Sequence, residues 1–253
     1  MSEFRPLAFN ASHFNVADKE KFAKAISLLK ESLECKGATL FSGDNMLLWN
    51  KGYSFLRKEE YLNYVTDSNT AMIPKSIVWR TYVLDYFMKR SLKAKGDMLE
   101  LGVLKGRTAK FLCEMNRDRI LDRKYILIDL FEWKPGDSHT AHSDLKRDGL
   151  FEEVRAEFVD FPFTEVIKGD VKKVLPMIDA EDIAFAHIDM NAAEPELFAL
   201  DYLLPKMAEG GAIVLDDYGW YAYWKQTVAI NKLLDKHGLE ILELPTGQGV
   251  LIF

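Results

Sequence analysis

Three aspartates follow two apolar segments in the second half of the chain. Asp189 closes IAFAHID, and Asp216 and Asp217 close AIVLDD. If both segments are neighbouring parallel strands, their carboxyl ends meet at one edge of the sheet and bring the three carboxylates together. Two like charges about 4 Å apart repel by roughly 4 kcal/mol at an effective dielectric near 20, so protons or a cation must neutralise them. Oxygen ligands suit Mg²⁺, and we predict that the three aspartates bind it or a similar divalent cation. The alternative is that one or two of them cap helices.

Histidines are candidates for proton transfer at the same edge. His187 lies two residues before Asp189 and points to the same side of a regular strand. It would act as a general base or as the partner of a metal ligand, and a core histidine is the alternative. His139 and His142 lie in the polar segment PGDSHTAHSDLKRDG, where they either reach a substrate or stay solvated.

A second set of residues is suited to a nucleoside cofactor. The segment LELGVLKG places Glu100, Gly102 and Gly106 in a turn between a strand and a helix, where glycines let the backbone approach a ligand. The turn is not the dinucleotide fingerprint, because Leu104 stands at the second glycine position, and a plain strand-to-helix turn is the alternative. Asp129 ends the next apolar segment, YILID, and its carboxylate can accept hydrogen bonds from ribose hydroxyls.

Further candidates follow the third and fifth strands. Gly169 and Asp170 come after TEVIK, and Asp170 either caps the following helix or contacts adenine, directly or through the neighbouring backbone. An aromatic run after the aspartate doublet either walls a pocket or belongs to the core; it comprises Tyr218, Trp220, Tyr221, Tyr223 and Trp224.

Alternating strands and helices would position these residues. We predict strands at MLELGV, YILIDLF, TEVIKG, IAFAHIDM, AIVLDDY, LEILEL and GVLIF, and helices near 107–116, 145–159, 171–178, 195–208 and 224–236. The alternation predicts an α/β fold with a doubly wound, mostly parallel seven-stranded sheet. The last strand should be antiparallel, because the turn PTGQG is too short for a helical crossover.

The N-terminal part has a different pattern. Apolar residues at helical spacing predict a helix over 18–34, whereas 36–73 reads as short helices and loops. Pro74 and Ser76 then open a helix that stops at Gly96. We therefore predict an N-terminal helical or cap extension over 1–75 and a main domain over 76–253.

Composition limits the partners of the chain. The net charge is −6 over 253 residues and no basic stripe is present, which argues against a nucleic-acid partner. No apolar run approaches the roughly 20 residues that span a bilayer. The two cysteines lack metal-ligand spacing and the first residues lack a secretory pattern, so we expect a cytoplasmic protein that acts on a small molecule.

With these residues in place, the chain resembles class I S-adenosylmethionine-dependent methyltransferases, and most closely the macrocin O-methyltransferase (TylF-like) family. The similarity runs from about Ser76 to the C-terminus and is carried by LELGVLKG, AHIDMNAAEPE, GGAIVLDDYG and LPTGQG. The resemblance implies a Rossmann-like fold and metal-dependent O-methylation of a hydroxyl on a sugar or small polyol, in natural-product or polysaccharide biosynthesis. It implies the same three aspartates as metal ligands, and it places at S-adenosylmethionine the residues Glu100, Gly102, Asp129 and Asp170.

Two departures from the related families leave the general base open. Many relatives have a second Asp where this chain has Asn191, and catechol methyltransferases have a lysine where it has Ala192. Asp189, His187 and the loop histidines are the candidates. A non-catalytic S-adenosylmethionine-binding protein and an NAD-dependent oxidoreductase are the alternative functions, and self-association through the aromatic N-terminal segment is a further expectation.

Overall fold

The computed structural model describes residues 9–34, 40–51, 53–59, 61, 77–120, 122–135 and 142–253. The chain divides into two compact units, Met1–Trp79 and Arg80–Phe253. The sequence analysis placed the boundary between residues 75 and 76. That position and the helix start expected at Pro74 and Ser76 lie outside the described residues.

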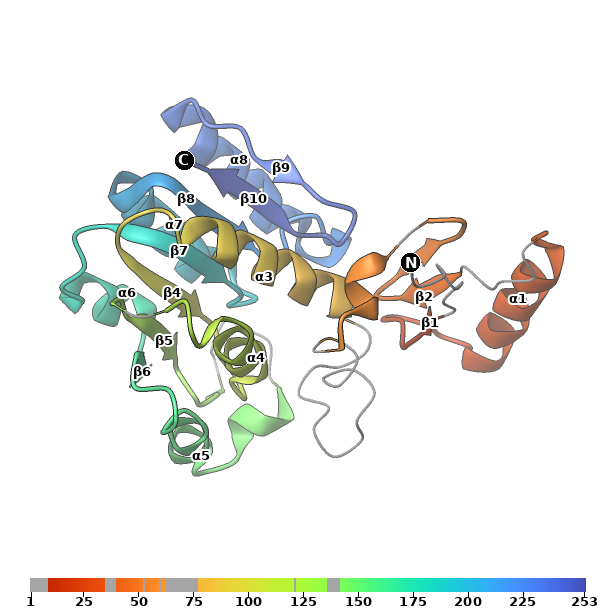
Figure 1. Cartoon of the computed structure of the whole chain (residues 1–253), viewed down its shortest axis with the longest axis horizontal. Coiled ribbons are helices and arrows are strands. Elements are labelled where there is room, and N and C mark those ends of the chain that lie inside the picture. The colour runs from red at the N-terminus through yellow and green to blue at the C-terminus, as the bar shows by residue number, and fades with distance from the viewer. Residues whose placement is uncertain are drawn as a thin grey trace. The chain divides into compact units, whose positions relative to one another are not determined.

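A seven-stranded sheet forms the centre of the Arg80–Phe253 unit (Figure 1). The strand order is β6-β5-β4-β7-β8-β10-β9, and β10 runs antiparallel to both of its neighbours while the pairs from β6 to β8 are parallel. This order confirms the predicted Rossmann-like sheet and its antiparallel last strand. The strands are β4 (Asp97–Leu101), β5 (Tyr125–Asp129), β6 (Thr164–Lys168), β7 (Ile183–Ile188), β8 (Met207–Leu215), β9 (Leu242–Glu243) and β10 (Gly249–Ile252).

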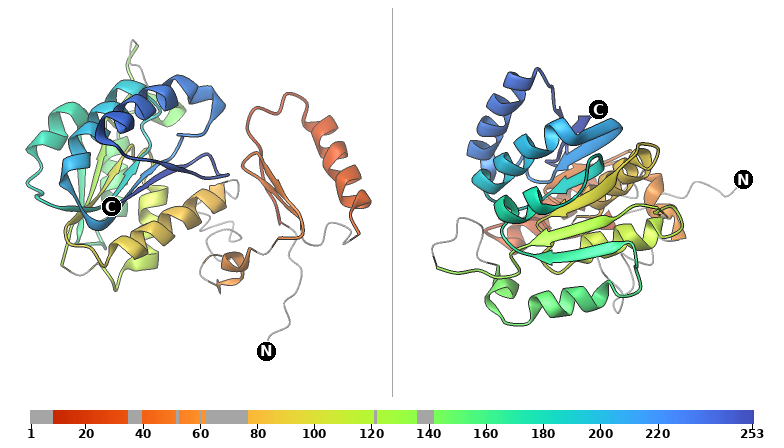
Figure 2. Two further views of the ribbon diagram at one scale, coloured as in Figure 1. Left: turned by 90° about the horizontal axis from the view of Figure 1, so that it is seen from above. Right: turned by 90° about the vertical axis from the view of Figure 1, so that its left-hand side faces the viewer.

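Helices cover both faces of this sheet, with α6, α7 and α8 on one face and α3 and α4 on the other (Figure 2). Short 3₁₀ helices extend or connect several of them, including η3 (Ser143–Lys146), η4 (Leu175–Met177), η5 (Leu204–Lys206) and η6 (Tyr221–Tyr223). The α-helices of this part of the chain are α3 (Val78–Ser91), α4 (Arg107–Asn116), α5 (Leu150–Glu157), α6 (Val171–Val174), α7 (Ala193–Leu203) and α8 (Trp224–His237).

The central strands are buried on both faces. Every residue of β7 is buried, and the apolar residues of β4, β5 and β8 pack against helices in a continuous core. Continuous apolar strands of this kind are typical of a parallel sheet with helices on both sides. Asp129, Asp189 and Asp216 lie at or just beyond the carboxyl ends of these strands, and the buried polar residues Glu100 and His187 lie within β4 and β7.

The N-terminal unit is not purely helical. Its helix α1 (Lys19–Ser32) is confirmed, and the Asp18 side chain caps it by accepting a hydrogen bond from the Lys21 N–H. A three-stranded sheet of β1 (Phe9–Asn10), β2 (Phe41–Gly43) and β3 (Met46–Leu48) accompanies it, followed by η1 (Ser54–Arg57).

The hairpin between β2 and β3 is the feature that the sequence analysis missed. Asp44 and Asn45 connect the two antiparallel strands, with φ of 51° and 58°. Positive φ at both turn residues is the mark of a type I′ hairpin, and Asp and Asn tolerate it. Within the described parts of the chain, neither unit contains a helix able to cross a membrane.

Candidate active site

A cavity of about 410 Å³ opens at the carboxyl ends of β4 to β7. This is the edge at which an open parallel sheet binds ligands, and the volume suits a small-molecule ligand. Five of the residues singled out for cofactor or metal binding line it, together with His142 and Asn191: they are Gly102, Asp129, Gly169, Asp170 and Asp189. The contacts of these residues with a cofactor stay a prediction.

Asp129 ties the end of β5 to the turn that follows β4. Its Oδ2 accepts hydrogen bonds from the backbone N–H groups of Val103 at 2.7 Å and Leu104 at 2.8 Å. Its Oδ1 accepts another from the Phe131 N–H at 2.7 Å. A carboxylate has about four acceptor sites, so these bonds leave about one for a ligand hydroxyl.

The glycine turn after β4 is required by chain packing. Gly102 has a φ of +93°, and a Cβ there would lie 1.8 Å from the carbonyl oxygen of Asp189. Gly106 begins α4 with a φ of +67°, and its Cβ would lie 2.7 Å from a ring carbon of Phe158. The sequence analysis offered ligand approach as a role for both glycines. The space where each Cβ would lie is filled by the protein itself, and Gly102 also lines the cavity, so its contact with a ligand stays a prediction.

Gly102→Ala should therefore destabilise the protein by more than about 4 kcal/mol, because the backbone of two strand ends must separate. Gly149→Ala is the matched control: Gly149 has a φ of +81°, but a Cβ there meets nothing within 4 Å. The control should lose only about 1–2 kcal/mol from the left-handed backbone conformation. Urea unfolding followed by circular dichroism measures both, and equal losses would refute the steric explanation.

Glu100 and Gly106 are not among the residues that line the cavity. The Glu100 side chain is buried, accepts a hydrogen bond from the Tyr125 hydroxyl at 2.5 Å, and lies 3.4 Å from Nδ1 of His187. Its observed contacts are with the protein core.

The structure brings Asp189 and Asp216 together, as predicted from their places at the ends of neighbouring strands. Their carboxylates and the imidazole of His187 offer ligand atoms that all lie within 4.8 Å of one another. His187 Nε2 is 3.7 Å from Asp216 Oδ1. Asp217 does not belong to this group of described residues; its Oδ1 lies 3.7 Å from a guanidinium nitrogen of Arg80.

Arg80 is the functional residue that the sequence analysis missed. Its Nη1 donates a hydrogen bond to Asp216 Oδ2 at 2.6 Å, and its guanidinium lies 5.5 Å from the centre of the Trp220 ring. Gln248 Nε2 donates to the other oxygen, Asp216 Oδ1, at 2.9 Å. The signal was a single arginine within the apolar run IVWRTYVL near the start of α3. The guanidinium of Arg80 thus supplies a positive charge beside the adjacent aspartates Asp216 and Asp217.

Burial and the neighbouring charges shift the pKa values of Asp189, Asp216 and His187. Burial, followed by repulsion from Asp216 and Asp217, raises the pKa of Asp189 well above its usual value. Burial acts in the same direction on Asp216, but Arg80 and His187 outweigh it and lower the pKa of that carboxyl. Burial alone would lower the pKa of His187, whereas its contacts with Asp216 and Glu100 raise it well above 6.5. Protons and the guanidinium together offset the carboxylate repulsion.

The donor set fits a divalent cation. Two carboxylates and an imidazole lie close enough to share one ion, and neither ring nitrogen of the buried His187 makes a hydrogen bond to the described residues. Carboxylate-rich sites suit Mg²⁺ and Mn²⁺. Asp216 already accepts from Arg80 and Gln248, so a cation would share or replace these contacts. Metal binding stays a prediction.

Of the two loop histidines, His142 lines the cavity and His139 lies outside the described residues. His142 Nδ1 is 3.1 Å from Asp144 Oδ2, and Lys105 Nζ is 2.8 Å from Asp144 Oδ1. The ion pair between Lys105 and Asp144 connects the turn after β4 to η3, and so fixes one wall of the cavity.

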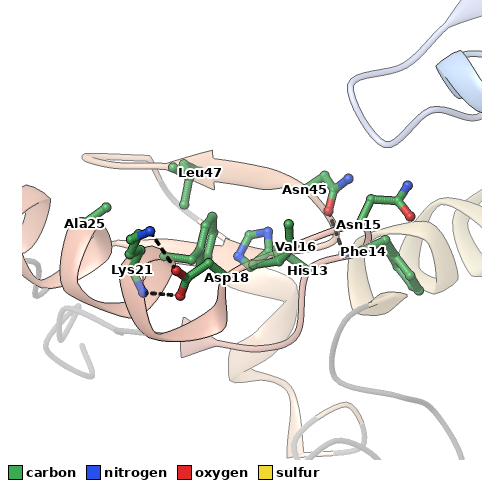
Figure 3. A pocket seen from close by; sticks show the side chains of 11 residues that line it. His13, Phe14, Asn15, Val16, Asp18, Lys21, Ala25, Asn45 and Leu47 are labelled. Atoms are coloured by element: carbon green, nitrogen blue, oxygen red, sulfur yellow. Dashed lines mark hydrogen bonds and ion pairs between the residues drawn. The ribbon is translucent and has the colours of Figure 1, made fainter.

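A second hollow, of about 580 Å³, lies within the N-terminal unit between α1, β3 and the segment 13–17 (Figure 3). Asp18 caps α1 and pairs with Lys21, and His13 bonds to Ser42. These side chains are already engaged, and none of the residues predicted to do chemistry lines this hollow.

Residues 99–218, which include the cavity and the carboxylate cluster, match a family described as a methyltransferase domain. This part of the chain is therefore similar to methyltransferase domains. The match begins in β4 and ends just after the aspartate doublet, so it includes every residue predicted to bind cofactor or metal. It does not single out the TylF-like family.

Individual relatives of the methyltransferase domain are distant. The chain is 28% identical over 138 residues to 8-demethyl-8-(2,3-dimethoxy-alpha-L-rhamnosyl)-tetracenomycin-C 4'-O-methyltransferase of Streptomyces olivaceus, covering 49% of this chain and 53% of that protein. The match thus spans about half the length of that relative. Among solved structures, the O-methyltransferase NovP has a TM-score of 0.61 at 20% identity, covering 79% of this chain and 87% of that one. CalS11, a calicheamicin methyltransferase, has a TM-score of 0.58 at 16% identity and covers 94% of each chain. At these identities the structures show a shared fold.

Proposed function

We propose that the chain is a metal-dependent O-methyltransferase of the TylF-like type, which moves a methyl group from S-adenosylmethionine to a hydroxyl of a sugar or other small polyol. The observation that carries the proposal is the position of Asp189. This residue lines the cavity that holds Asp129 and Asp170, and it also belongs to the cluster with His187 and Asp216. One site therefore has room for a donor beside groups able to activate a hydroxyl.

The names of the relatives favour a sugar acceptor. The Streptomyces relative is named for 4'-O-methylation of a rhamnosyl-tetracenomycin, and CalS11 is also described as a TDP-rhamnose 3'-O-methyltransferase. A deoxysugar on a natural product or on a nucleotide is thus the acceptor class that we propose. Self-association of the chain stays a prediction.

In the proposed complex, Asp129 accepts a hydrogen bond from the ribose of the donor. Asp170 is partly engaged, because its side chain caps α6 by accepting from the Lys172 N–H at 3.0 Å. We therefore assign adenine contacts to the backbone of this turn. Holding donor and acceptor in one cavity is itself catalytic, since it removes much of the entropic cost of their encounter.

Asp189 is the proposed proton acceptor. It lines the cavity, whereas His187 is only 2% exposed and is not part of the wall. As the acceptor oxygen forms its bond to the methyl carbon, the bond from carbon to sulfur breaks and the hydroxyl proton passes to Asp189. A bound divalent cation would supply Lewis acidity that lowers the pKa of the acceptor hydroxyl. His187 then supports Asp216 from below the cavity floor.

Mass spectrometry with S-adenosylmethionine carrying a deuterated methyl group tests the proposed function. The purified protein is incubated with rhamnosides, nucleotide deoxysugars, catechols and primary amines. We expect the label on a sugar hydroxyl, with transfer lost in EDTA and restored by Mg²⁺. Transfer to an amine, or transfer that EDTA leaves unchanged, would contradict the proposal.

A further inference from the structure

The turn after Asp189 is held by side chains from η6, which leads into α8, and from α7. Asn191 lines the cavity, and its Nδ2 donates a hydrogen bond to Asp189 Oδ1 at 3.0 Å. The side-chain oxygen of Asn191, Oδ1, in turn accepts a hydrogen bond from the Tyr223 hydroxyl at 2.6 Å. The three side chains form a chain of contacts from η6 to the carboxylate that faces the cavity.

The orientation of the Asn191 amide follows from its neighbours. The Asn191 NH₂ group donates to Asp189 Oδ1, and Asn191 Oδ1 faces the Tyr223 hydroxyl. The tyrosine hydroxyl can donate to that oxygen, and it thereby fixes the amide in this orientation. Asn191 also has a φ of +53°, a left-handed conformation that Asn tolerates better than most residues.

A second contact, from Glu196 of α7, fixes the backbone of the same turn. Glu196 Oε1 accepts a hydrogen bond from the Met190 N–H at 3.1 Å, and the Glu196 carboxylate also interacts with the next two backbone N–H groups. Gln226, which is buried, donates to Glu196 Oε2. Tyr223 and Gln226 are three residues apart and so lie on the same side of the helix start. Tyr223 of η6 thus holds the Asn191 side chain, while Glu196 of α7, which accepts from Gln226 of α8, holds the backbone of the turn.

We propose that Asn191 and Tyr223 are positioning residues that hold the Asp189 carboxylate in the orientation required for metal binding and proton transfer. The inference rests on the proposed function. It assigns a role to the Asn191 amide, which donates a hydrogen bond to Asp189. The Tyr223 hydroxyl keeps that amide from turning away.

Tyr223→Phe removes the hydroxyl alone, and Tyr218→Phe is its matched control. The Tyr218 hydroxyl donates to Asn231 Oδ1 at the same distance of 2.6 Å, but that asparagine is on the outer part of α8 and does not line the cavity. Both variants lose one hydrogen bond of the same kind. Only Tyr223→Phe should change the orientation of the Asp189 carboxylate, and with it the Mn²⁺ affinity and kcat.

The readouts are Mn²⁺ affinity by electron paramagnetic resonance, S-adenosylhomocysteine affinity by calorimetry, and kcat for the acceptor identified above. We expect Tyr223→Phe to weaken Mn²⁺ binding and kcat each by about tenfold and to leave S-adenosylhomocysteine affinity within about twofold, as for partners of metal ligands in general. Asn191→Ala should have at least this effect, and adding Tyr223→Phe to it should cost nothing more, because the two act through one path.

The outcomes separate the two proposals. If the wild-type protein binds neither Mn²⁺ nor S-adenosylhomocysteine, the proposed function fails. If the wild-type protein binds both and Tyr223→Phe behaves like Tyr218→Phe, the positioning role is wrong while the function stands. Additive losses in the double variant would also overturn it, since they would indicate two independent structural effects.

Discussion

Arg80→Ala is expected to destabilise the protein by about 3–5 kcal/mol, the cost typical of removing one partner of a buried ion pair. The Arg80 side chain is 11% exposed and those of Asp216 and Asp217 are 9% and 10% exposed. Truncation leaves two neighbouring carboxylates enclosed without the guanidinium that pairs with them. The loss of the contact with Trp220 adds to the effect.

A divalent cation should restore part of the stability that Arg80→Ala loses. With Arg80 removed, Asp216 Oδ2 is open to a metal ion, so excess Mg²⁺ should stabilise Arg80→Ala more than it stabilises the wild-type protein. Urea unfolding of the full chain in EDTA and in Mg²⁺ measures both quantities.

Lys124→Ala is the control for this experiment. Lys124 pairs with Glu165 at 3.4 Å, but the two side chains are 64% and 50% exposed. An exposed pair of this kind contributes at most about 1 kcal/mol. If Arg80→Ala were no more destabilising than Lys124→Ala, the guanidinium would not be the counter-charge of the doublet.

The sheet could be predicted because its strands are short, apolar and separated by helical segments. Residues such as those of β7 are buried on both faces, so the strand pattern is strong, and the alternation with helices predicts a parallel sheet. The hairpin at Asp44 and Asn45 could not be predicted in the same way. Its strands are only three residues long, and the turn signal stands among scattered aromatics and charges.

The carboxylate cluster was predictable only in part. Strand ends in a parallel sheet meet at one edge, which places Asp189 beside Asp216 without any knowledge of side-chain contacts. Adjacent residues at the end of a strand do not project in the same direction, and this separates Asp217 from the group. Arg80 lies more than a hundred residues away in sequence, so its ion pair depends on how α3 packs against the sheet.

Asp216→Asn should reduce methyl transfer by at least about a thousandfold. The substitution removes the carboxylate charge that pairs with Arg80 and His187 and that offers an oxygen ligand to a cation. Asp216 is not among the residues that line the cavity, so binding of S-adenosylhomocysteine should change by less than about threefold. Asp235→Asn, at an exposed site on α8, is the control and should keep full transfer.

Retained transfer in Asp216→Asn would exclude the metal proposal. Loss of both transfer and S-adenosylhomocysteine binding would point instead to a collapsed site, and circular dichroism of the variant identifies that case. The two readouts therefore distinguish a chemical role of Asp216 from a purely structural one.

The most direct test of the central claim is calorimetric titration of S-adenosylhomocysteine into the wild-type protein and Asp216→Asn, each with and without Mg²⁺. The account predicts one binding site per chain in all four titrations, with a Mg²⁺ effect in the wild-type protein alone. Absence of binding to the wild-type protein in both buffers would contradict the assignment of the cavity to this cofactor.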